Sequence, residues 1–310
     1  THDVPVFTMI NNTDTLYPKV TTFKHPKPGQ LNSAVRVGVV PAVGGSPVWI
    51  KTPGDPRNTY IARLEWAGNS REVILQHLNR LQNTLTVFLG DAATGEARSV
   101  FTDTDETWVE IMEDFVWLDG GRSLLWLSER DGWQHVYRVS RDGRDIQLLT
   151  PGDYDVLSVD AVDERGGWLY VTASPADATK RFLFRVRMDG KSAPVPVGPA
   201  GQTGVHRYDI SPSARWAFHT SGQLDMPPVT ELIRLPEGRS VRTMAANGPL
   251  KAKVDSLQRK RVDFFKLDIG DGIQVDGWRI LPPEFDPAKK YPLLVYVYGE
   301  PAGQTVQDNW

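Results

Sequence analysis

The sequence lacks cysteine, long apolar runs and any excess of charge of one sign. With 0 cysteines among 310 residues, disulfide bonds, thiolate zinc sites, iron–sulfur clusters and a cysteine nucleophile are excluded. No apolar run reaches the roughly 18 residues that cross a bilayer, so we expect no membrane span in this chain. The 35 basic and 38 acidic residues give a net charge of −3. Because no block of one sign stands out, we expect no nucleic-acid partner.

The usual motifs of cofactor and metal sites are also missing. Neither a Gly-x-Gly-x-x-Gly nor a Walker sequence occurs, and the 6 histidines show no His-Glu-x-x-His spacing. The run from Asp103 to Thr107 hints at a calcium loop, but Trp108 stands where such a loop needs glycine. We therefore expect no cofactor and no bound metal.

Turn-forming residues, in contrast, are plentiful. The 27 glycines and 23 prolines make up about one residue in six, against roughly one in eight in average proteins. The chain also has 40% hydrophobic residues and 10 tryptophans, too many for a disordered protein. This composition favours short strands joined by tight turns over long helices.

A repeat of about 48 residues organises the glycines. Strand-like runs that end in a turn are closed by Gly95, Gly143, Gly190 and Gly238, at intervals of 48, 47 and 48 residues. Glycine permits the positive φ that such hairpin turns require. Other strand-like runs flank each turn, and four short strands in one repeat of this length are typical of one β-propeller blade.

We expect four blades between residues 59 and 247 and a partial copy near residues 34–45. An irregular β-sandwich with evenly spaced hairpins is the alternative. Four blades can close a propeller, but the incomplete first copy predicts further blades upstream. The start of the sequence, which has neither an initiator methionine nor a signal-peptide pattern, likewise predicts an internal part of a longer chain. The predicted propeller core includes tryptophans 66, 117, 126, 133 and 168.

The repeat ends after Gly248, and the sequence changes character. Residues 251–261 are charged and predict a linker or a short helix, and residues 262–281 predict a β-hairpin around glycine-rich turn residues. Residues 291–298 are almost continuously apolar. Such a run is typical of a strand that is buried on both faces of an α/β sheet, so a second domain is expected to begin here.

Residues 281–301 read Leu-Pro-Pro-Glu-Phe-Asp-Pro-Ala-Lys-Lys-Tyr-Pro-Leu-Leu-Val-Tyr-Val-Tyr-Gly-Glu-Pro. This stretch closely resembles the beginning of the α/β-hydrolase domain in the prolyl oligopeptidase superfamily. Residues 75–83 and 128–137 resemble blade segments of its dipeptidyl peptidase IV branch. The resemblance implies a mainly β fold, a partial β-propeller of about four to five four-stranded blades of an eight-bladed ring. Residues 1–250 would be its later, incomplete blades, and residues 251–310 a linker and the first strands of an α/β-hydrolase domain.

The same resemblance implies a serine exopeptidase that releases N-terminal dipeptides, preferentially after proline or alanine, through an acyl-serine intermediate. Its implied partners are a peptide substrate with a free N-terminus and, in the full-length enzyme, a second copy in a homodimer. This chain has no Gly-x-Ser-x-Gly elbow, and the acid and histidine follow the serine in this fold. We therefore expect the chain alone to be inactive. A non-catalytic propeller that serves as a binding scaffold is the alternative.

Tyr298 is the predicted catalytic residue of this chain. In the family that the sequence resembles, a tyrosine followed by two residues and proline stabilises the oxyanion, and Tyr298-Gly-Glu-Pro301 fits that pattern. A neutral phenol at a strand end can donate to developing negative charge. Glu300 departs from the commoner alanine-glycine spacing, so the geometry of the loop between Tyr298 and Pro301 is expected to differ from that of the family. The alternative is a tyrosine that only packs at the end of a strand.

The resemblance also places pocket-edge residues near the start of the blade at residues 108–113. Here Glu110, Met112 and Glu113 are the predicted substrate-binding residues; an ordinary inner strand is the alternative. Family dipeptidyl peptidases hold the substrate's amino group with a Glu-Glu pair, and no adjacent Glu-Glu occurs in this sequence. That clamp would then lie upstream, or the specificity differs.

Overall fold

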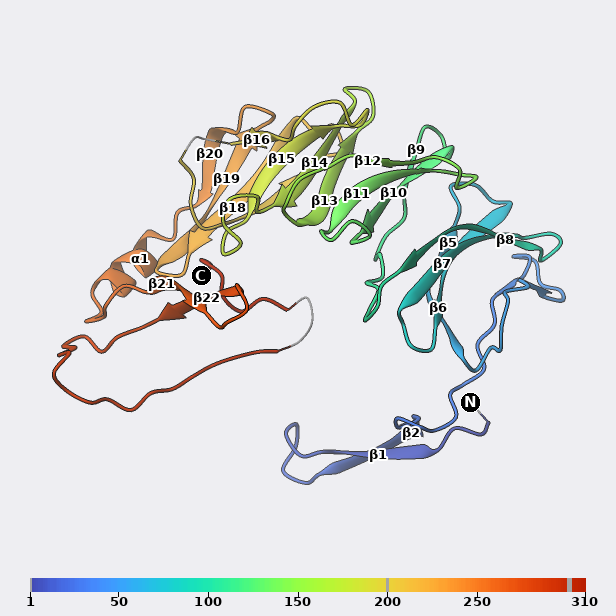
Figure 1. Ribbon diagram of the computed structural model, residues 1–310, viewed down its shortest axis with the longest axis horizontal. Helices are drawn as coiled ribbons and strands as arrows, with labels where there is room; N and C mark the ends of the chain where they lie inside the picture. Colours follow the sequence, from blue (N-terminus) through green and yellow to red (C-terminus); the bar gives the residue numbers. More distant parts are fainter. Residues whose placement is uncertain (1, 199–200, 300–302) are drawn as a thin grey trace. The chain divides into compact units, whose positions relative to one another are not determined.

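The computed structural model describes residues 2–198, 201–299 and 303–310. It contains four four-stranded antiparallel sheets that follow one another along the chain (Figure 1). The chain divides into two compact units, one of residues 1–132 and 137–147 and the other of residues 133–136 and 148–310. These sheets are the predicted blades, which confirms a mainly β, partial propeller fold.

In all four sheets, strands that are consecutive in sequence are paired in space, as expected for short strands joined by hairpin turns. The sheets comprise β5 (Thr59–Trp66), β6 (Glu72–Asn79), β7 (Thr84–Asp91) and β8 (Ala97–Thr104); β9 (Val116–Leu118), β10 (Ser123–Ser128), β11 (His135–Ser140) and β12 (Ile146–Leu148); β13 (Val156–Asp163), β14 (Trp168–Ala173), β15 (Phe182–Arg187) and β16 (Val195–Val197); and β17 (Val205–Ile210), β18 (Trp216–Gln223), β19 (Met226–Arg234) and β20 (Arg239–Ala245).

Two smaller sheets precede the first blade. β3 (Gly38–Val39) pairs with β4 (Val48–Trp49) and forms the predicted partial copy of the repeat. Before it, β1 (Val6–Asn11) and β2 (Lys19–Lys24) form an antiparallel hairpin with register Val6 to Lys24.

The repeat glycines occupy the turns that the sequence predicts for them. Gly95, Gly143, Gly190 and Gly238 have φ values of 75°, 75°, 65° and 64°, in the left-handed region where a side chain is disfavoured. Each lies between the third and fourth strands of its sheet. The positive φ explains why glycine recurs at this point of every blade.

In the first unit, the repeat glycines also contact the preceding sheet. A Cβ atom on Gly143 would overlap the backbone carbonyl oxygen of Val100 in β8, and one on Gly95 would overlap that of Trp49 in β4. The carbonyl oxygen of Gly95 accepts a hydrogen bond from the amide of Lys51 at 2.8 Å. A side chain at either glycine would therefore push neighbouring sheets apart.

Arg141 reinforces this contact from the same turn as Gly143. Its guanidinium donates to the carbonyl oxygen of Ala67 at 2.9 Å and pairs with Glu72 at 2.6 Å. The group also lies 4.7 Å from the ring centre of Trp117, within the range of a cation–π interaction. The turn of the second blade is thus bound to the first blade by charge as well as by close packing.

The second unit repeats the arrangement. A Cβ atom on Gly238 would overlap the backbone of Gly198, which follows β16. The two sheets concerned share an apolar core, which excludes water between them. Its buried residues come from both sheets and their turns: Tyr170, Leu183, Val197, Ala214, Ala217, Ile233 and Leu235.

The predicted tryptophan core is only partly correct. Trp126 is 1% exposed, whereas Trp66 and Trp133 are 50% and 40% exposed. Trp66 is the last residue of β5, and Trp133 lies outside the strands, so neither is covered by a neighbouring sheet. Periodic spacing placed these two rings near blades but did not determine their burial.

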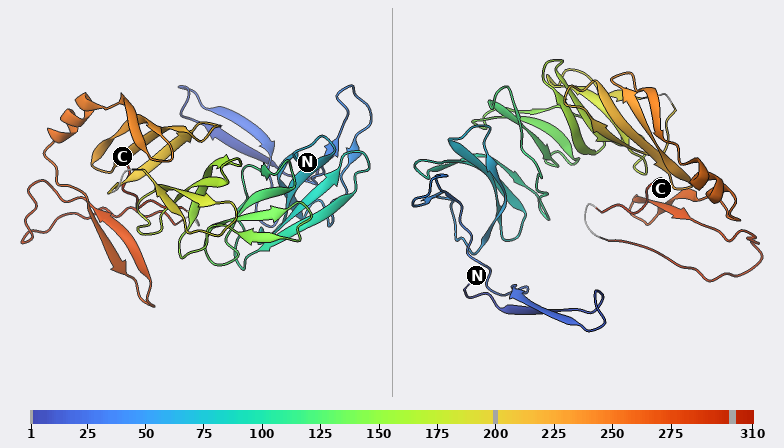
Figure 2. Two further views of the ribbon diagram at one scale, coloured as in Figure 1. Left: turned by 90° about the horizontal axis from the view of Figure 1, so that it is seen from above. Right: turned by 180° about the vertical axis from the view of Figure 1, so that it is seen from behind.

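After the last blade, α1 (Gly248–Asp255) forms the predicted short helix, with proline in its first turn. β21 (Asp263–Asp268) then pairs with β22 (Gln274–Arg279), which confirms the predicted hairpin. In the left view of Figure 2 this hairpin projects beyond the β17–β20 sheet.

The buried strand predicted at residues 291–298 is not formed. No strand occurs in residues 280–299, and the side chains of Leu293 and Leu294 are 86% and 92% exposed. A strand that is apolar on both faces needs paired neighbours and covering layers. None of the described residues pairs with this segment, so its α/β-sheet environment is absent.

Replacing Gly143 and Gly120 by alanine distinguishes the cost of the close contact between sheets from the cost of a positive φ. Gly120 also has a positive φ of 65°, and no atom lies within 4 Å of where its Cβ would be. We expect Gly120→Ala to lower the free energy of unfolding by about 1–2 kcal/mol, and Gly143→Ala by a further 1–3 kcal/mol or so, as in overpacked cores. Urea denaturation of both variants measures the difference. Equal losses would show that the contact with Val100 does not matter.

Candidate functional site

The predicted substrate-binding residues lie in the connection between β8 and β9. Residues 105–115 contain no strand, so the alternative of an ordinary inner strand is wrong. Asp105 starts this connection and accepts hydrogen bonds from the hydroxyl and the amide of Thr107, both at 2.7 Å. These bonds lower the pKa of the Asp105 carboxyl. The amide of Val109 donates to the carbonyl of Gln82 at 2.9 Å, which ties the connection to the turn after β6.

Met112 is held against the first blade. Its amide donates to Oε1 of Gln76 at 3.2 Å, and Nε2 of Gln76 donates to its carbonyl oxygen at 2.6 Å. Gln76 lies on β6 and is 0% exposed, and Met112 itself is 8% exposed. The buried side-chain amide of Gln76 thus satisfies the backbone groups of Met112, which have no strand partner. The predicted role of Met112 toward a substrate stays a prediction.

The two glutamates differ in what they contact. Glu113 forms an ion pair with Arg63 of β5. Glu110 is exposed, and the described part of the chain supplies no ion-pair partner for it. Of these two glutamates, Glu110 is therefore the one whose carboxylate has no ion pair among the described residues. Alternation along β5 marks Arg63 as one of its polar positions, but the sequence does not reveal the pairing with Glu113.

A buried charged cluster beside this connection escaped the sequence analysis. Asp103, at the end of β8, is 6% exposed; it pairs with Arg130 and accepts a hydrogen bond from Nε1 of Trp126 at 2.5 Å. The guanidinium of Arg130 also lies 5.2 Å from the ring centre of Tyr137. Burial raises the pKa of Tyr137, as does its hydrogen bond with Asp131. The cluster fixes the segment after β10 to the end of β8.

Tyr298, the predicted oxyanion-stabilising residue, lies in the segment without a strand. Its side chain is 54% exposed. Glu300 and Pro301, which complete the motif, lie outside the described residues. The substrate-binding candidates belong to the first unit and Tyr298 to the second.

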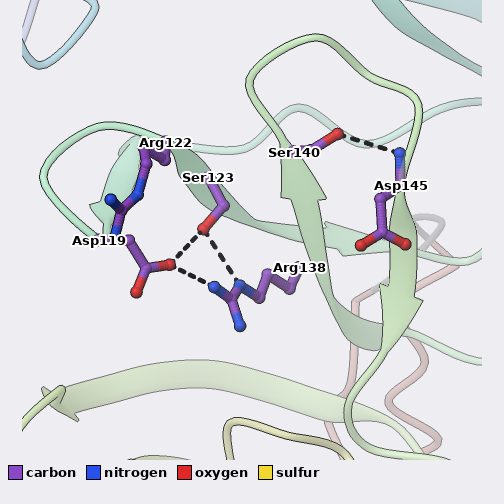
Figure 3. A pocket seen from close by; sticks show the side chains of 6 residues that line it. All are labelled: Asp119, Arg122, Ser123, Arg138, Ser140 and Asp145. Atoms are coloured by element: carbon purple, nitrogen blue, oxygen red, sulfur yellow. Dashed lines mark hydrogen bonds and ion pairs between the residues drawn. The ribbon is translucent and has the colours of Figure 1, made fainter.

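A polar pocket lies within the first unit (Figure 3). It has a volume of about 250 Å³ and is lined by Asp119, Arg122, Ser123, Arg138, Ser140 and Asp145.

Two charged groups of this pocket, Arg138 and Asp119, bind each other. Arg138 pairs with Asp119 and donates from Nε to the hydroxyl of Ser123 at 3.1 Å, and that hydroxyl donates to Asp119 at 2.9 Å. The Ser123 bond and the charge of Arg138 lower the pKa of Asp119. A carboxylate with a lowered pKa is a weak base, and this one is bound by Arg138 and Ser123. The geometry supports a structural role for this pocket.

Two buried histidines face each other in the second unit. His206 of β17 and His219 of β18 are 3% and 5% exposed, and Nδ1 of His206 lies 2.8 Å from Nε2 of His219. Nε2 of His206 lies 3.1 Å from the carbonyl oxygen of Thr203. A carbonyl can only accept, so Nε2 of His206 carries a proton, and its Nδ1 accepts from His219 when both rings are neutral.

The surroundings of the pair disfavour protonation. Burial and the neighbouring His206 lower the pKa of His219 to about 4, and burial lowers that of His206. The ring of Tyr208 stacks on His219 with centres 4.6 Å apart. Glu231 lies opposite His219 in the register of β18 and β19, and its charge raises the pKa of His219. Nearby, burial raises the pKa of Asp160.

The described residues form neither a candidate metal site nor a membrane-spanning helix. Among residues 2–198, 201–299 and 303–310, no group of at least three His, Cys, Asp or Glu side chains could hold a metal ion. The same residues include no helix with the length and apolar character needed to cross a membrane.

Comparison with known proteins gives consistent matches along the chain. The family model of the dipeptidyl peptidase IV (DPP IV) N-terminal region matches residues 1–228. Dipeptidyl peptidase 4 of Trichophyton rubrum is 24% identical over 319 residues, which cover 100% of this chain and 41% of that protein. The corresponding protein of Arthroderma otae matches with the same identity and coverage. The chain thus spans about two fifths of the length of these curated relatives.

A solved structure shows the same fold. The crystal structure of Porphyromonas gingivalis dipeptidyl peptidase 4 superimposes with a TM-score of 0.88 at 23% sequence identity. The match covers 99% of this chain and 43% of that one. This likeness supports the partial propeller described above.

The histidine pair predicts a pH dependence of stability. Since the unfolded chain protonates His219 near pH 6.5 and the folded chain only near pH 4, stability is full above about pH 6.5 and falls as the pH decreases toward 4. This histidine alone should remove about 2 kcal/mol between pH 7.5 and pH 5. In His219→Gln, whose amide can still donate to His206, the decline measured by urea denaturation should be smaller. An unchanged decline would contradict the assignment.

Proposed function

Because the chain belongs to the family of the dipeptidyl peptidase IV N-terminal region, we propose that it is part of a serine exopeptidase that releases N-terminal dipeptides. The single observation that carries the proposal is the family match over residues 1–228. Preference for proline or alanine before the cleaved bond belongs to the same proposal, as does a homodimer of the whole enzyme.

In this proposal residues 1–250 are propeller blades and residues 251–310 are a linker and the start of the catalytic α/β-hydrolase domain. The end of the last four-stranded sheet at Ala245, followed by α1, supports a boundary near residue 250. The hairpin β21–β22 would belong to the catalytic domain. Residues 291–298 would become a strand there, because the rest of that domain would supply its missing neighbours.

The proposed chemistry needs a serine in a Gly-x-Ser-x-Gly elbow, and this chain contains no such elbow. The serine would attack the carbonyl carbon of the second residue, and the carbonyl oxygen would become an oxyanion. The phenol of Tyr298 would donate a hydrogen bond to that oxyanion, which lowers the barrier without reorganisation of solvent. Departure of the shortened peptide leaves the dipeptide as an acyl-serine ester, which water hydrolyses.

Glu110, Met112 and Glu113 are the proposed substrate-binding residues of this chain. Glu110 is the stronger candidate because its exposed carboxylate has no ion pair within the described ranges. Glu113 would first have to leave Arg63. Met112, whose backbone is bound to Gln76, would set the position of both.

A chromogenic assay of the whole protein that contains this chain tests the function. We expect hydrolysis of glycyl-prolyl p-nitroanilide, no hydrolysis of its N-acetylated counterpart, and labelling of one serine by a fluorophosphonate. The labelled serine should lie in a Gly-x-Ser-x-Gly elbow within about 100–150 residues after Trp310, the span of one domain. Lack of both the elbow and the activity would favour the non-catalytic scaffold.

Tyr298→Phe tests the oxyanion role within that assay. Removing the phenol should lower kcat about 10²–10³-fold, as for other oxyanion donors, with little change in KM. Tyr296→Phe is the matched control, since it removes a hydroxyl two residues away in the same segment. Equal kcat values for the two variants would remove Tyr298 from the mechanism.

A further inference from the structure

The turn between β18 and β19 contacts two distant segments of the chain. Gln223 pairs with Met226, so Leu224 and Asp225 form a two-residue turn at the end of the last blade. One contacted segment follows α1 and precedes β21, and the other is formed by residues 303–310. All of these residues belong to the second unit.

Asp225 binds the segment that follows α1. Its carboxylate pairs with Arg259 and accepts a hydrogen bond from the amide of Val262 at 2.9 Å. Arg259 also donates to the backbone carbonyl oxygen of Asp225 at 2.9 Å. The side chains of Asp225 and Arg259 are 24% and 30% exposed, so this pair is better shielded from solvent than an ordinary surface ion pair.

Leu224 binds the segment at residues 303–310. Its amide donates to Oδ1 of Asp308 at 3.0 Å, and the amide of Asp308 donates to the carbonyl oxygen of Thr179 at 2.8 Å. Gln304 binds residues next to Thr179. Its side chain accepts a hydrogen bond from Arg181 and donates one to the carbonyl oxygen of Ala178 at 2.6 Å.

We propose that the Leu224–Asp225 turn is an anchor that fixes both ends of the stretch between Val262 and Asp308 to the last blade. The inference rests on the proposed function in one respect, because this stretch contains Tyr298. Tyr298 lies six residues before Gln304, and six extended residues reach only about 20 Å. Binding of residues 304–308 therefore limits where the phenol can lie. Asp308 is thereby a positioning residue for Tyr298.

Hydrogen exchange of the 310-residue chain, followed by mass spectrometry, tests the anchor. Asp225→Ala should speed exchange of peptides covering residues 257–262 about tenfold or more, since a charge-assisted contact is lost. Asp308→Ala should do the same for residues 303–310. Asp225→Asn, which keeps an acceptor for Val262, should give an intermediate rate. Asp209→Ala, an exposed position in the same blade, is the control and should leave both segments unchanged.

Two outcomes of this exchange experiment overturn the anchor. The first is wild-type exchange of both segments in Asp225→Ala and Asp308→Ala. The second is a similar acceleration in the Asp209→Ala control, which would show general loosening of the blade.

Kinetics of the whole protein test the positioning role separately. Asp308→Ala should lower kcat about tenfold while KM changes less than about twofold, because the oxyanion donor is displaced and the substrate contacts are not. Asp225→Ala, which releases only the segment before β21, should lower kcat less. Wild-type kcat in Asp308→Ala would overturn the positioning role. If the unmodified protein releases no dipeptide while the exchange results hold, the proposed function fails and the anchor stands.

Discussion

The contact between a turn glycine and the preceding sheet is the constraint on which this propeller depends. At Gly95 and Gly143 the space for a Cβ atom is occupied by a carbonyl oxygen of the neighbouring sheet, and at Gly238 by the backbone of Gly198. Packing at this distance lets two sheets share an apolar core, as Leu183 and Ile233 do in the second unit. Since each contact recurs at the same point of a blade, the interval between glycines equals the length of one blade.

This constraint explains why the blades could be predicted from the sequence. Positive φ favours glycine and close approach of a neighbouring backbone requires it, so each turn is recognisable in the sequence by one glycine, which strand propensity alone would not reveal. Residues 291–298 show the opposite case. Their apolar pattern indicates a strand, but strand formation depends on partners outside the segment, and the described residues supply none. Trp66 and Trp133 fail for a similar reason, because burial depends on which sheet covers a ring.

The candidate site was less predictable than the fold because its contacts join residues that are far apart in sequence. The sequence singled out Met112 and Glu113, but not their partners Gln76 and Arg63 on the first blade. Nothing in the local pattern around Asp225 indicates that it binds both Arg259 and Val262. Motifs therefore identified residues whose side chains could take part in catalysis or binding. Only the packing of the blades showed which of these residues are held in place.

The most direct test of the glycine contact is the exchange rate of one amide. The amide of Lys51 donates to the carbonyl oxygen of Gly95 at 2.8 Å, so it reports on the contact between β4 and the turn that follows β7. In folded Gly95→Ala, residue-resolved hydrogen exchange should show the Lys51 amide opening about tenfold faster or more, with amides in the middle of β6 near their original rates. An unchanged rate at Lys51 would contradict the claim that glycine is required for the sheets to meet.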